Sequence, residues 1–389
     1  MKTFAEKAGS PSAARVIEMF GSSPIVRVAT FEDYDQIAAL QIRNGLPARA
    51  YEDWRMLWTG NPVYQQRDGQ WPIGWVLETK TAGIVGSIGN IPLAYQLKGR
   101  ELLAATPCAW VVDASYRSYS MRVVSCLMRQ KTIDLFIFTT VSSASEPSYR
   151  TVFRFSRVPV GKWDKSDFWI TNHRGFSQSA LTMKSIPLAK VMSYPVSAAL
   201  FCWDRFSDPG LRVNGASSEI ELCSDFDNRF DEFWEELKHQ KDNALLAVRT
   251  RETLAWHFRY SLMRQNVWIL AASKGSRLIA YAIFDRLDNL AIGLKRIRLV
   301  DFQALNGGEK VLGSALCWML DKCRKEGIHV LEISGCWLDR TNLPQIPAPY
   351  QRNLSSWSYY YRAIDKNLSE PLADPKVWAP SSFDGDASL

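Results

Sequence analysis

Several features that would identify a protein class are scarce or absent in this 389-residue sequence. It contains no run of about 18 apolar residues, so we expect no membrane-spanning helix. The first twenty residues lack the continuous apolar segment of a secretory signal peptide, which favours a cytoplasmic location. The seven cysteines include no Cys-x-x-Cys pair, and the four histidines lack metal-ligand spacing, so we expect reduced thiols and no metal site.

Strong charge is also missing. Lys and Arg together number 47 against 40 Asp and Glu, a net charge of +7, without a dense basic arm. This mild excess suits anionic small ligands as well as nucleic acid, but without a basic arm we expect no nucleic-acid partner. Aromatic residues are abundant, with 15 Trp, 18 Phe and 14 Tyr, which indicates large cores. At roughly 100–200 residues per domain, the length indicates two or three domains.

Hydrophobic periodicity predicts one order of elements in the first half of the chain and the same order in the second half. In the first half, helices are expected from residue 31 and over 118–131, and strands over 24–29, 71–79, 83–92, 93–98, 101–112 and 135–141. In the second half, the expected elements are strands 219–223, 267–272, 278–285, 294–305 and 328–334 and helices 226–237, 252–260 and 309–325.

The recurrence predicts an α+β protein built from two copies of one architecture. The copies are expected at 24–165 and 215–365, separated by a linker at 166–214 that carries a bridging helix over 188–206. Residues 1–23 and 366–389 are expected to form tails.

The segment Trp-Val-Val-Asp-Ala-Ser-Tyr-Arg-Ser-Tyr-Ser-Met-Arg at 110–122 places a strand end before a helix start. It resembles the central motif of the GNAT acyltransferase superfamily, whose fold implies two GNAT-like units, each a mixed, mostly antiparallel twisted sheet flanked by helices. Backbone N–H groups at a helix start attract anions. The resemblance implies that this segment binds the pyrophosphate of acetyl-CoA or another acyl-CoA. The implied cofactor-binding residues are Val111, Val112, Arg117, Ser118, Tyr119, Ser120, Met121 and Arg122.

Two positions depart from the family pattern. Ser120 and Arg122 stand where the family has glycines, which let a backbone approach phosphate without a Cβ. The Ser120 hydroxyl is able to donate to a phosphate, and Arg122 either reaches one or fills its space. The alternative is an ordinary helix N-terminus capped by Ser118.

The segment 142–155 resembles the second family motif, in which a tyrosine often acts as general acid. Phe153 takes the place of that tyrosine, and Tyr149, four residues earlier on the same helical face, is the candidate acid. A packing role is the alternative for Tyr149. Glu78 and Glu146 are candidate bases, with surface carboxylates as the alternative.

Asp301 is the best-placed carboxylate inside a long strand of the second half. It is a candidate base or acceptor ligand, although we favour an ion pair with Arg296 or Arg298. In the same half, Asn306-Gly307-Gly308 before a helix is a permissive anion-binding turn.

The helix pair that precedes the strands forms the acceptor wall in such folds. Arg43, Asn44, Trp58 and Asn61 combine hydrogen-bonding and aromatic groups that suit a sugar, and they are the candidate acceptor residues. The alternative for Trp58 and its neighbour Trp54 is a place in the core.

Short stretches at 58–62, 84–92 and 378–386 resemble tandem GNAT proteins of bacterial cell-surface polysaccharide loci. The leading hypothesis is therefore an acyl-CoA-dependent N-acyltransferase that acts on an amino sugar or another small amine. One alternative is a binding protein whose sites have degenerated. The other follows from a similarity of the two-copy layout to Fem-type aminoacyltransferases, which use aminoacyl-tRNA.

Overall fold

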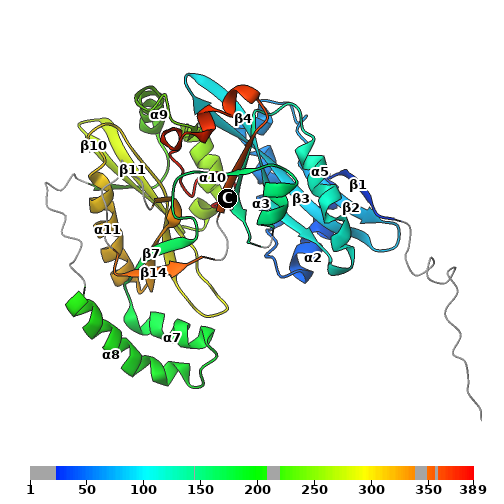
Figure 1. The fold of residues 1–389 in the computed structure, drawn as a ribbon. Helices are drawn as coiled ribbons and strands as arrows, with labels where there is room; N and C mark the ends of the chain where they lie inside the picture. Colours follow the sequence, from blue (N-terminus) through cyan, green and yellow to red (C-terminus); the bar gives the residue numbers. More distant parts are fainter. Residues whose placement is uncertain (1–22, 144, 208–219, 338–347, 355–357) are drawn as a thin grey trace, which may run out of the picture. The chain divides into compact units, whose positions relative to one another are not determined.

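The computed structural model describes residues 23–143, 145–207, 220–337, 348–354 and 358–389. Two mixed, mostly antiparallel sheets are flanked by helices, which confirms the α+β class (Figure 1). The chain divides into two compact units, which we describe separately. Unit 1 comprises Met1–Trp58, Gly69–Ile91 and Pro107–Gln130, and unit 2 comprises Thr59–Asp68, Pro92–Thr106 and Lys131–Leu389.

The first sheet has the strand order β1-β2-β3-β4-β5-β15-β6, with β9 paired to β3. Its strands are β1 Ile25–Val28, β2 Gly74–Thr79, β3 Gly83–Leu97, β4 Arg100–Val112, β5 Leu135–Val141, β6 Ser156–Arg157, β9 Leu246–Ala247 and β15 Ser358–Ala363. The strands expected separately over 83–92 and 93–98 form one continuous strand, β3. Burial of Ile91, Pro92 and Tyr95 carries the apolar pattern through the expected break.

Helices of unit 1 follow the predicted periodicity. They are η1 Phe31–Asp33, α2 Tyr34–Arg43, α3 Tyr51–Thr59, which ends at the unit boundary, η2 Ala114–Tyr119 and α5 Ser120–Met128. The buried side chains of α5 are Val123, Val124 and Leu127, at the spacing of one helical face. The helix expected over 118–131 is therefore shorter than predicted and is preceded by a 3₁₀ segment.

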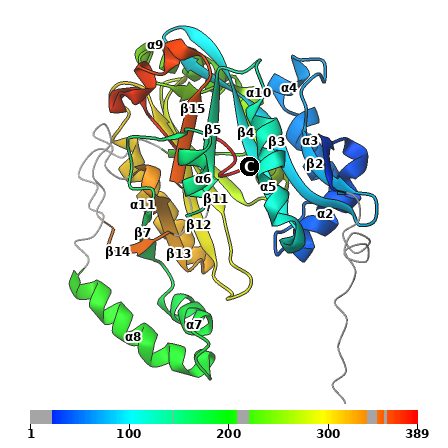
Figure 2. The same ribbon diagram turned by 45° about the vertical axis from the view of Figure 1, so that its right-hand side comes forward.

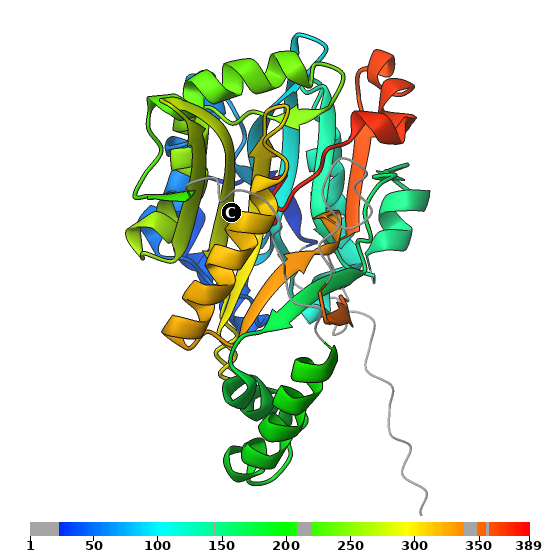
Figure 3. The same ribbon diagram turned by 90° about the vertical axis from the view of Figure 1, so that its left-hand side faces the viewer.

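The second sheet lies wholly in unit 2, in the order β14-β7-β13-β12-β11-β10-β8. Its strands are β7 Lys165–Ile170, β8 Ile220–Cys223, β10 Val267–Lys274, β11 Arg277–Arg286, β12 Arg296–Ala304, β13 Val330–Ser334 and β14 Tyr350–Asn353. Its unit also contains the helices α4 Pro62–Gln65, α6 Glu146–Thr151, α7 His173–Met183, α8 Ala189–Ser207, α9 Asn228–Gln240, α10 Arg251–Met263 and α11 Val311–Glu326. Figure 3 shows α11, in orange, lying across one face of this sheet.

Two strands of unit 2 pair far from their sequence neighbours. β7 begins at the expected end of the first domain, and its Trp169 pairs with Leu331 of β13. β15 lies in the expected second domain, and its Tyr361 pairs with Ile137 of β5 (Figure 2). The first sheet thus contains β15 from the second half of the sequence, and the second sheet contains β7 from the first half. The domain boundaries expected at residues 165 and 365 stay predictions.

The segment 366–389, expected to form a tail, packs within unit 2. Three short 3₁₀ turns, η4 Lys366–Leu368, η5 Pro371–Ala373 and η6 Pro375–Val377, lead to a buried stretch at 381–385. Phe383 lies in the main hydrophobic core. Among the described residues, no helix is long and apolar enough to cross a membrane.

Candidate active site

The turn after β4 is built by a carboxylate clamp in unit 1. Asp113, the first residue beyond β4, accepts hydrogen bonds from Arg43 Nε at 2.9 Å and Arg43 Nη2 at 2.7 Å. Asn44 Nδ2 donates to the same carboxylate at 2.7 Å. The Arg43 side-chain hydrogen bond, opposed by partial burial, holds the pKa of Asp113 below its usual value. Asp113 therefore orients the turn, and the two candidate acceptor residues Arg43 and Asn44 serve this clamp.

The main chain after Asp113 enters a 3₁₀ helix and then α5 without a break. The amide of Tyr116 donates to the Asp113 carbonyl at 2.8 Å, and the amide of Ser120 donates to the Arg117 carbonyl. Because the helical segment starts at Ala114, its unpaired first amides lie nearer to Asp113 than predicted. Ser118 does not cap α5, since the N-cap residue is Tyr119, which makes no side-chain cap hydrogen bond.

No side chain of the 3₁₀ segment at this turn is buried. Arg117 and Ser118 are exposed. The guanidinium of Arg122 lies 4.8 Å from the centre of the Tyr119 ring, as a cation–π contact. Arg117 precedes Ser120 by three residues and Arg122 follows it by two, so two positive charges lie near the start of α5.

β4 changes conformation shortly before this turn. Its parallel ladder with β5 consists of the pairs Ala104–Leu135 and Ala105–Phe136. Pro107 follows, without an N–H, and Ala109 has a φ of +47°, a left-handed conformation that is costly for a residue with a Cβ. Val112 then packs so closely on β3 that a Cβ at Gly86 would lie 3.1 Å from its Cγ2 atom.

The corresponding turn of unit 2, between β12 and α11, is filled by side chains. The Asn306 amide donates to Gln240 Oε1 at 2.8 Å, and the Gly307 amide donates to Glu309 Oε2 at 3.0 Å. A carboxylate and an amide oxygen therefore occupy the positions that an anion would take at this turn. Of the two turns, the one in unit 1 is the better candidate for an anionic ligand.

Trp58 and Asn61, the other candidate acceptor residues, are both buried. Trp58 packs against Trp54 with ring centres 5.2 Å apart, and its indole donates to the Asn90 carbonyl at 2.7 Å. Asn61 caps α4 through the Val63 amide and donates to the Pro92 carbonyl. Trp54 and Trp58 belong to the hydrophobic core.

Tyr149 and Glu78, two of the candidate catalytic residues, lie in different surroundings. The Tyr149 ring in α6 packs edge-on against Phe138 at 5.1 Å, and burial raises the pKa of its hydroxyl. Glu78 in β2 is partly exposed and accepts from Arg27 Nε at 2.7 Å. Tyr149 is thus a protonated, enclosed hydroxyl, and Glu78 is one half of an ion pair.

Asp301 forms the expected ion pair, but with a different arginine. Its carboxylate lies 2.8 Å from Arg249 Nε and 3.1 Å from Arg249 Nη2, with both side chains at 1% exposure or less. Burial would raise the pKa of Asp301, but the Arg249 charge brings it below its usual value. The expected partners on β12, Arg296 and Arg298, contact another carboxylate.

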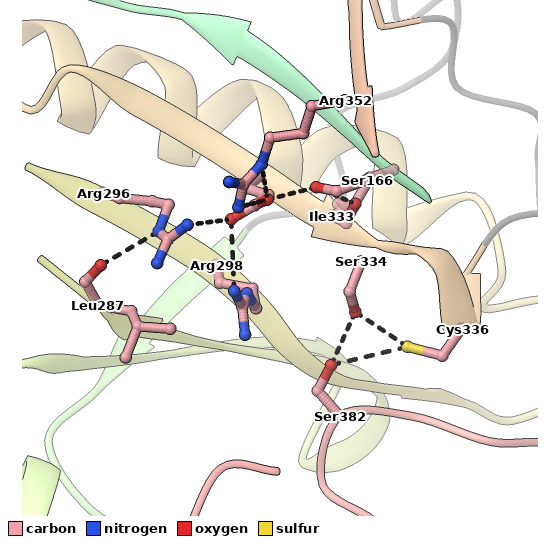
Figure 4. Close-up of polar contacts among 10 residues, drawn as sticks. Ser166, Leu287, Arg296, Arg298, Ile333, Ser334, Cys336, Arg352 and Ser382 are labelled. Carbon is pink, nitrogen blue, oxygen red and sulfur yellow. Dashed lines mark hydrogen bonds and ion pairs between the residues drawn. The ribbon is translucent and has the colours of Figure 1, made fainter. Parts of the chain in front are cut away.

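That other carboxylate is Glu332 on β13, which the sequence did not single out (Figure 4). It is contacted by Ser166 and by Arg296 at 3.1 Å, Arg298 at 3.5 Å and Arg352 at 2.8 Å. Burial opposes ionisation, but the three arginines lower the pKa of Glu332 to about 2.

A second polar group lies beside Glu332 on the second sheet (Figure 4). The hydroxyls of Ser334 and Ser382 are 2.8 Å apart, and the Cys336 thiol is within 3.6 Å of both. The sequence signal for these groups is weak, because their members come from segments up to 186 residues apart in the chain. No group of three or more candidate metal ligands occurs among the described residues.

Comparison with known proteins gives a fold but no sequence family. No family model and no curated protein matches the sequence. Yeast (Saccharomyces cerevisiae) N-myristoyltransferase with bound myristoyl-CoA matches with a TM-score of 0.52 at 12% identity, over 88% of this chain and 80% of that one. A GCN5-related N-acetyltransferase from Anabaena variabilis matches with 0.53 at 12%, over 88% and 73%. A probable N-acyltransferase from Enterococcus faecalis gives 0.53 at 12%, over 88% and 72%. The expected GNAT-like fold with two sheets is thereby confirmed.

Proposed function

We propose that this protein is an acyl-CoA-dependent N-acyltransferase whose cofactor binds at the turn between β4 and α5 of unit 1. The observation that carries the proposal is this turn, clamped by Asp113, Arg43 and Asn44 and flanked by exposed Arg117. The fold supports it, since the similar structures include N-acyltransferases and one of them contains myristoyl-CoA.

The residues of the turn suit a diphosphate. Arg117 offers a charged, planar donor group, and the hydroxyls of Ser118 and Ser120 are able to donate. The guanidinium of Arg122 lies on the Tyr119 ring, and the unpaired amides of the helical segment are those that follow Asp113, because the Ser120 amide already donates to the Arg117 carbonyl. Val111 and Val112 precede the turn and would offer backbone groups to the rest of the cofactor.

An acyl-CoA supplies an activated thioester, and the protein must align it with an amine and supply a proton for the leaving thiolate. Tyr149, kept protonated by burial, is the candidate proton donor. Asp301 is not carried forward as a base in this proposal, because its carboxylate is enclosed with Arg249. The acceptor we propose is an amino sugar or another small amine, on the similarity of 58–62 and 84–92 to polysaccharide-locus proteins.

A second candidate function is cofactor binding without catalysis. Two observations favour it. Ser120 and Arg122 carry side chains where the family has glycines, and the Ser120 amide is already used in a hydrogen bond to the Arg117 carbonyl. Binding and turnover therefore need separate measurements.

The test is calorimetric titration of the full chain with acetyl-CoA and with a long-chain acyl-CoA. We expect one site per chain and a loss of about tenfold in affinity for Arg117→Ala, which removes one charge-assisted hydrogen bond. Arg129→Ala is the matched control, since Arg129 is also exposed, ends the same helix and carries the same charge. Its affinity should stay within about twofold.

Thiol release on a panel of amines then separates the two candidate functions. Turnover with an amine supports the transferase, whereas cofactor binding without thiol release on any amine supports the binding protein. Absence of acyl-CoA binding, or equal affinities for Arg117→Ala and Arg129→Ala, would contradict the proposed site.

A further inference from the structure

The helices α7 and α8 form a hairpin in unit 2. An ordinary surface helix turns its apolar side inward and its polar side to solvent, whereas this hairpin does the opposite. It follows β7 and is capped by Asn172, whose side chain accepts from the Gly175 amide at 2.8 Å. Figures 1 and 3 show the two helices side by side beyond the end of the second sheet. Its connection to that sheet includes Phe176 and Leu200, which pack against a small cluster around Phe168.

The faces that the two helices turn inward are small and polar. Ser177 and Ser179 of α7 and Ser193 of α8 are buried. Asp204 of α8 lies 2.6 Å from His173 Nε2 and also binds the Tyr350 hydroxyl. Small side chains and a partly buried polar contact therefore hold the two helices together, and few of the large apolar side chains of the hairpin lie between them.

Those large side chains are instead more exposed to solvent, although Tyr194 also contacts the Arg174 guanidinium and Phe201 packs edge-on against His173. The exposed apolar residues of the hairpin are Met183, Ile186, Leu188, Val191, Met192, Tyr194, Phe201, Trp203 and Phe206. Trp203 is 64% exposed and Phe206 is 90% exposed, values far above those of core residues. On a helical wheel with 100° per residue, the exposed apolar residues of α8 lie on one arc of about 200°. Phe201 stands at one edge of this arc and Trp203 at the other. We call this surface the outer face of the hairpin.

The charge of the hairpin has one dominant sign. Arg174, Lys184, Lys190 and Arg205 are exposed, and no Asp or Glu occurs between His173 and Trp203. The single acid, Asp204, is engaged inside the hairpin. Residues 171–207 thus carry four basic side chains and one acidic side chain, a net charge of +3 out of +7 for the whole chain.

We propose that the outer face of the α7–α8 hairpin docks on an anionic lipid surface. An apolar helix face with Trp, Phe and Leu, edged by Lys and Arg, is the composition that lies in the membrane interface. The tip of the hairpin, from the last residue of α7 to the start of α8, carries the exposed apolar residues Met183, Ile186 and Leu188 and the exposed Lys184. The tip is therefore both apolar and basic, like the outer face. Anionic headgroups complement the net positive charge of the hairpin.

Two features favour a lipid surface over a second protein helix. A seam for one partner helix is a narrow stripe, whereas the outer face covers about half of the circumference of α8 and continues around the tip. Among the described residues no helix is able to span a membrane, so the contact would be interfacial. The proposal is independent of acyl transfer and concerns where the protein acts.

The test is sedimentation of the full chain with extruded vesicles of phosphatidylcholine alone and of phosphatidylcholine with phosphatidylglycerol at about 3:1. We expect binding to the anionic vesicles, weakened when sodium chloride is raised from about 0.05 M to about 0.5 M. The double variant Met192→Gln/Trp203→Gln should lower partitioning at least tenfold, because it removes two apolar contacts. Met263→Gln/Leu290→Gln, at positions 67% and 88% exposed elsewhere in unit 2, is the matched control and should change it less than twofold.

The electrostatic part is tested by Lys184→Gln/Lys190→Gln, which should lower binding to anionic vesicles about tenfold. Lys274→Gln/Lys366→Gln removes the same charge from exposed positions elsewhere in unit 2 and is its control. Thermal unfolding confirms that the variants fold. Equal binding to both vesicle types, or binding unchanged in both hairpin variants, overturns the proposal. A dimer in light scattering that Met192→Gln/Trp203→Gln converts to monomer also overturns it, in favour of a second copy as the partner.

Discussion

Replacing Asp301 by Asn separates a structural from a catalytic role for this carboxylate. Asn has nearly the same volume, so the substitution opens no cavity, but it removes the charge that faces Arg249. The Arg249 side chain is 1% exposed, and in the variant its charged group keeps the Ala247 carbonyl, the Ser381 hydroxyl and the face of the Phe383 ring as neighbours, none of which carries a negative charge. The variant therefore leaves a buried and uncompensated positive charge.

The expected cost is about 3–5 kcal/mol in the free energy of unfolding of unit 2, the range for breaking a buried ion pair from one side. Removing both charges, in Arg249→Met/Asp301→Asn, should recover about 2 kcal/mol of this. The recovery is partial because the Ala247 carbonyl and the Ser381 hydroxyl lose their donor.

The assay is urea unfolding followed by circular dichroism, with linear extrapolation to water. Asp321→Asn is the control, since Asp321 pairs with Arg324 at 2.8 Å but both side chains are more than half exposed. It should cost less than about 1 kcal/mol. If Asp301→Asn abolishes acyl transfer while the free energy of unfolding stays unchanged, the ion-pair interpretation is refuted and Asp301 is catalytic.

Three further predictions concern other sites. Asp113→Ala should weaken acyl-CoA binding at least tenfold in calorimetry, because Arg43 and Asn44 lose the carboxylate that orients the turn. Burial raises the pKa of Asp384 to about 6, above its value in the unfolded chain, so the folded state binds the extra proton and stability falls as pH rises from about 4 to about 6. Asp384→Asn should remove this loss in thermal unfolding across that pH range. Ala109→Gly should stabilise unit 1 by about 1 kcal/mol in urea unfolding, because glycine adopts the left-handed conformation of Ala109 without strain.

Each of these has its own control. Glu52→Ala removes a carboxylate from an exposed position of the same helix pair and should leave acyl-CoA affinity within about twofold. For Asp384, a stability difference between variant and native protein that is equal at pH 4 and pH 7 would contradict the assigned cause. For Ala109, the contrasting substitution is Ala114→Gly in η2, which should destabilise; stabilisation by both would show that the effect is not specific to the left-handed position.

Much of the local structure follows from the sequence alone. Alternation and helical periodicity are properties of adjacent residues, so they predicted β1, β5, α8 and α11 to within two or three residues. They also predicted that one order of elements occurs twice.

Contacts between distant segments could not be predicted in this way. Asp301 was expected to pair with an arginine on its own strand, yet its partner Arg249 is 52 residues away and is brought there by the strand β9 and the turn before α10. The bulge in β12 decides which side chains share a face, and it leaves no clear mark in the sequence.

The α7–α8 hairpin shows the same division. The richness of 188–206 in Ala, Val and Leu predicted a helix, and the apolar side of a helix ordinarily lies against a core. Periodicity reports that one side of a helix is apolar, but it does not report what that side faces. Only the tertiary structure shows that the small polar side of α8 packs inward and that Trp203 and Phe206 point to solvent, because burial depends on which elements approach in space.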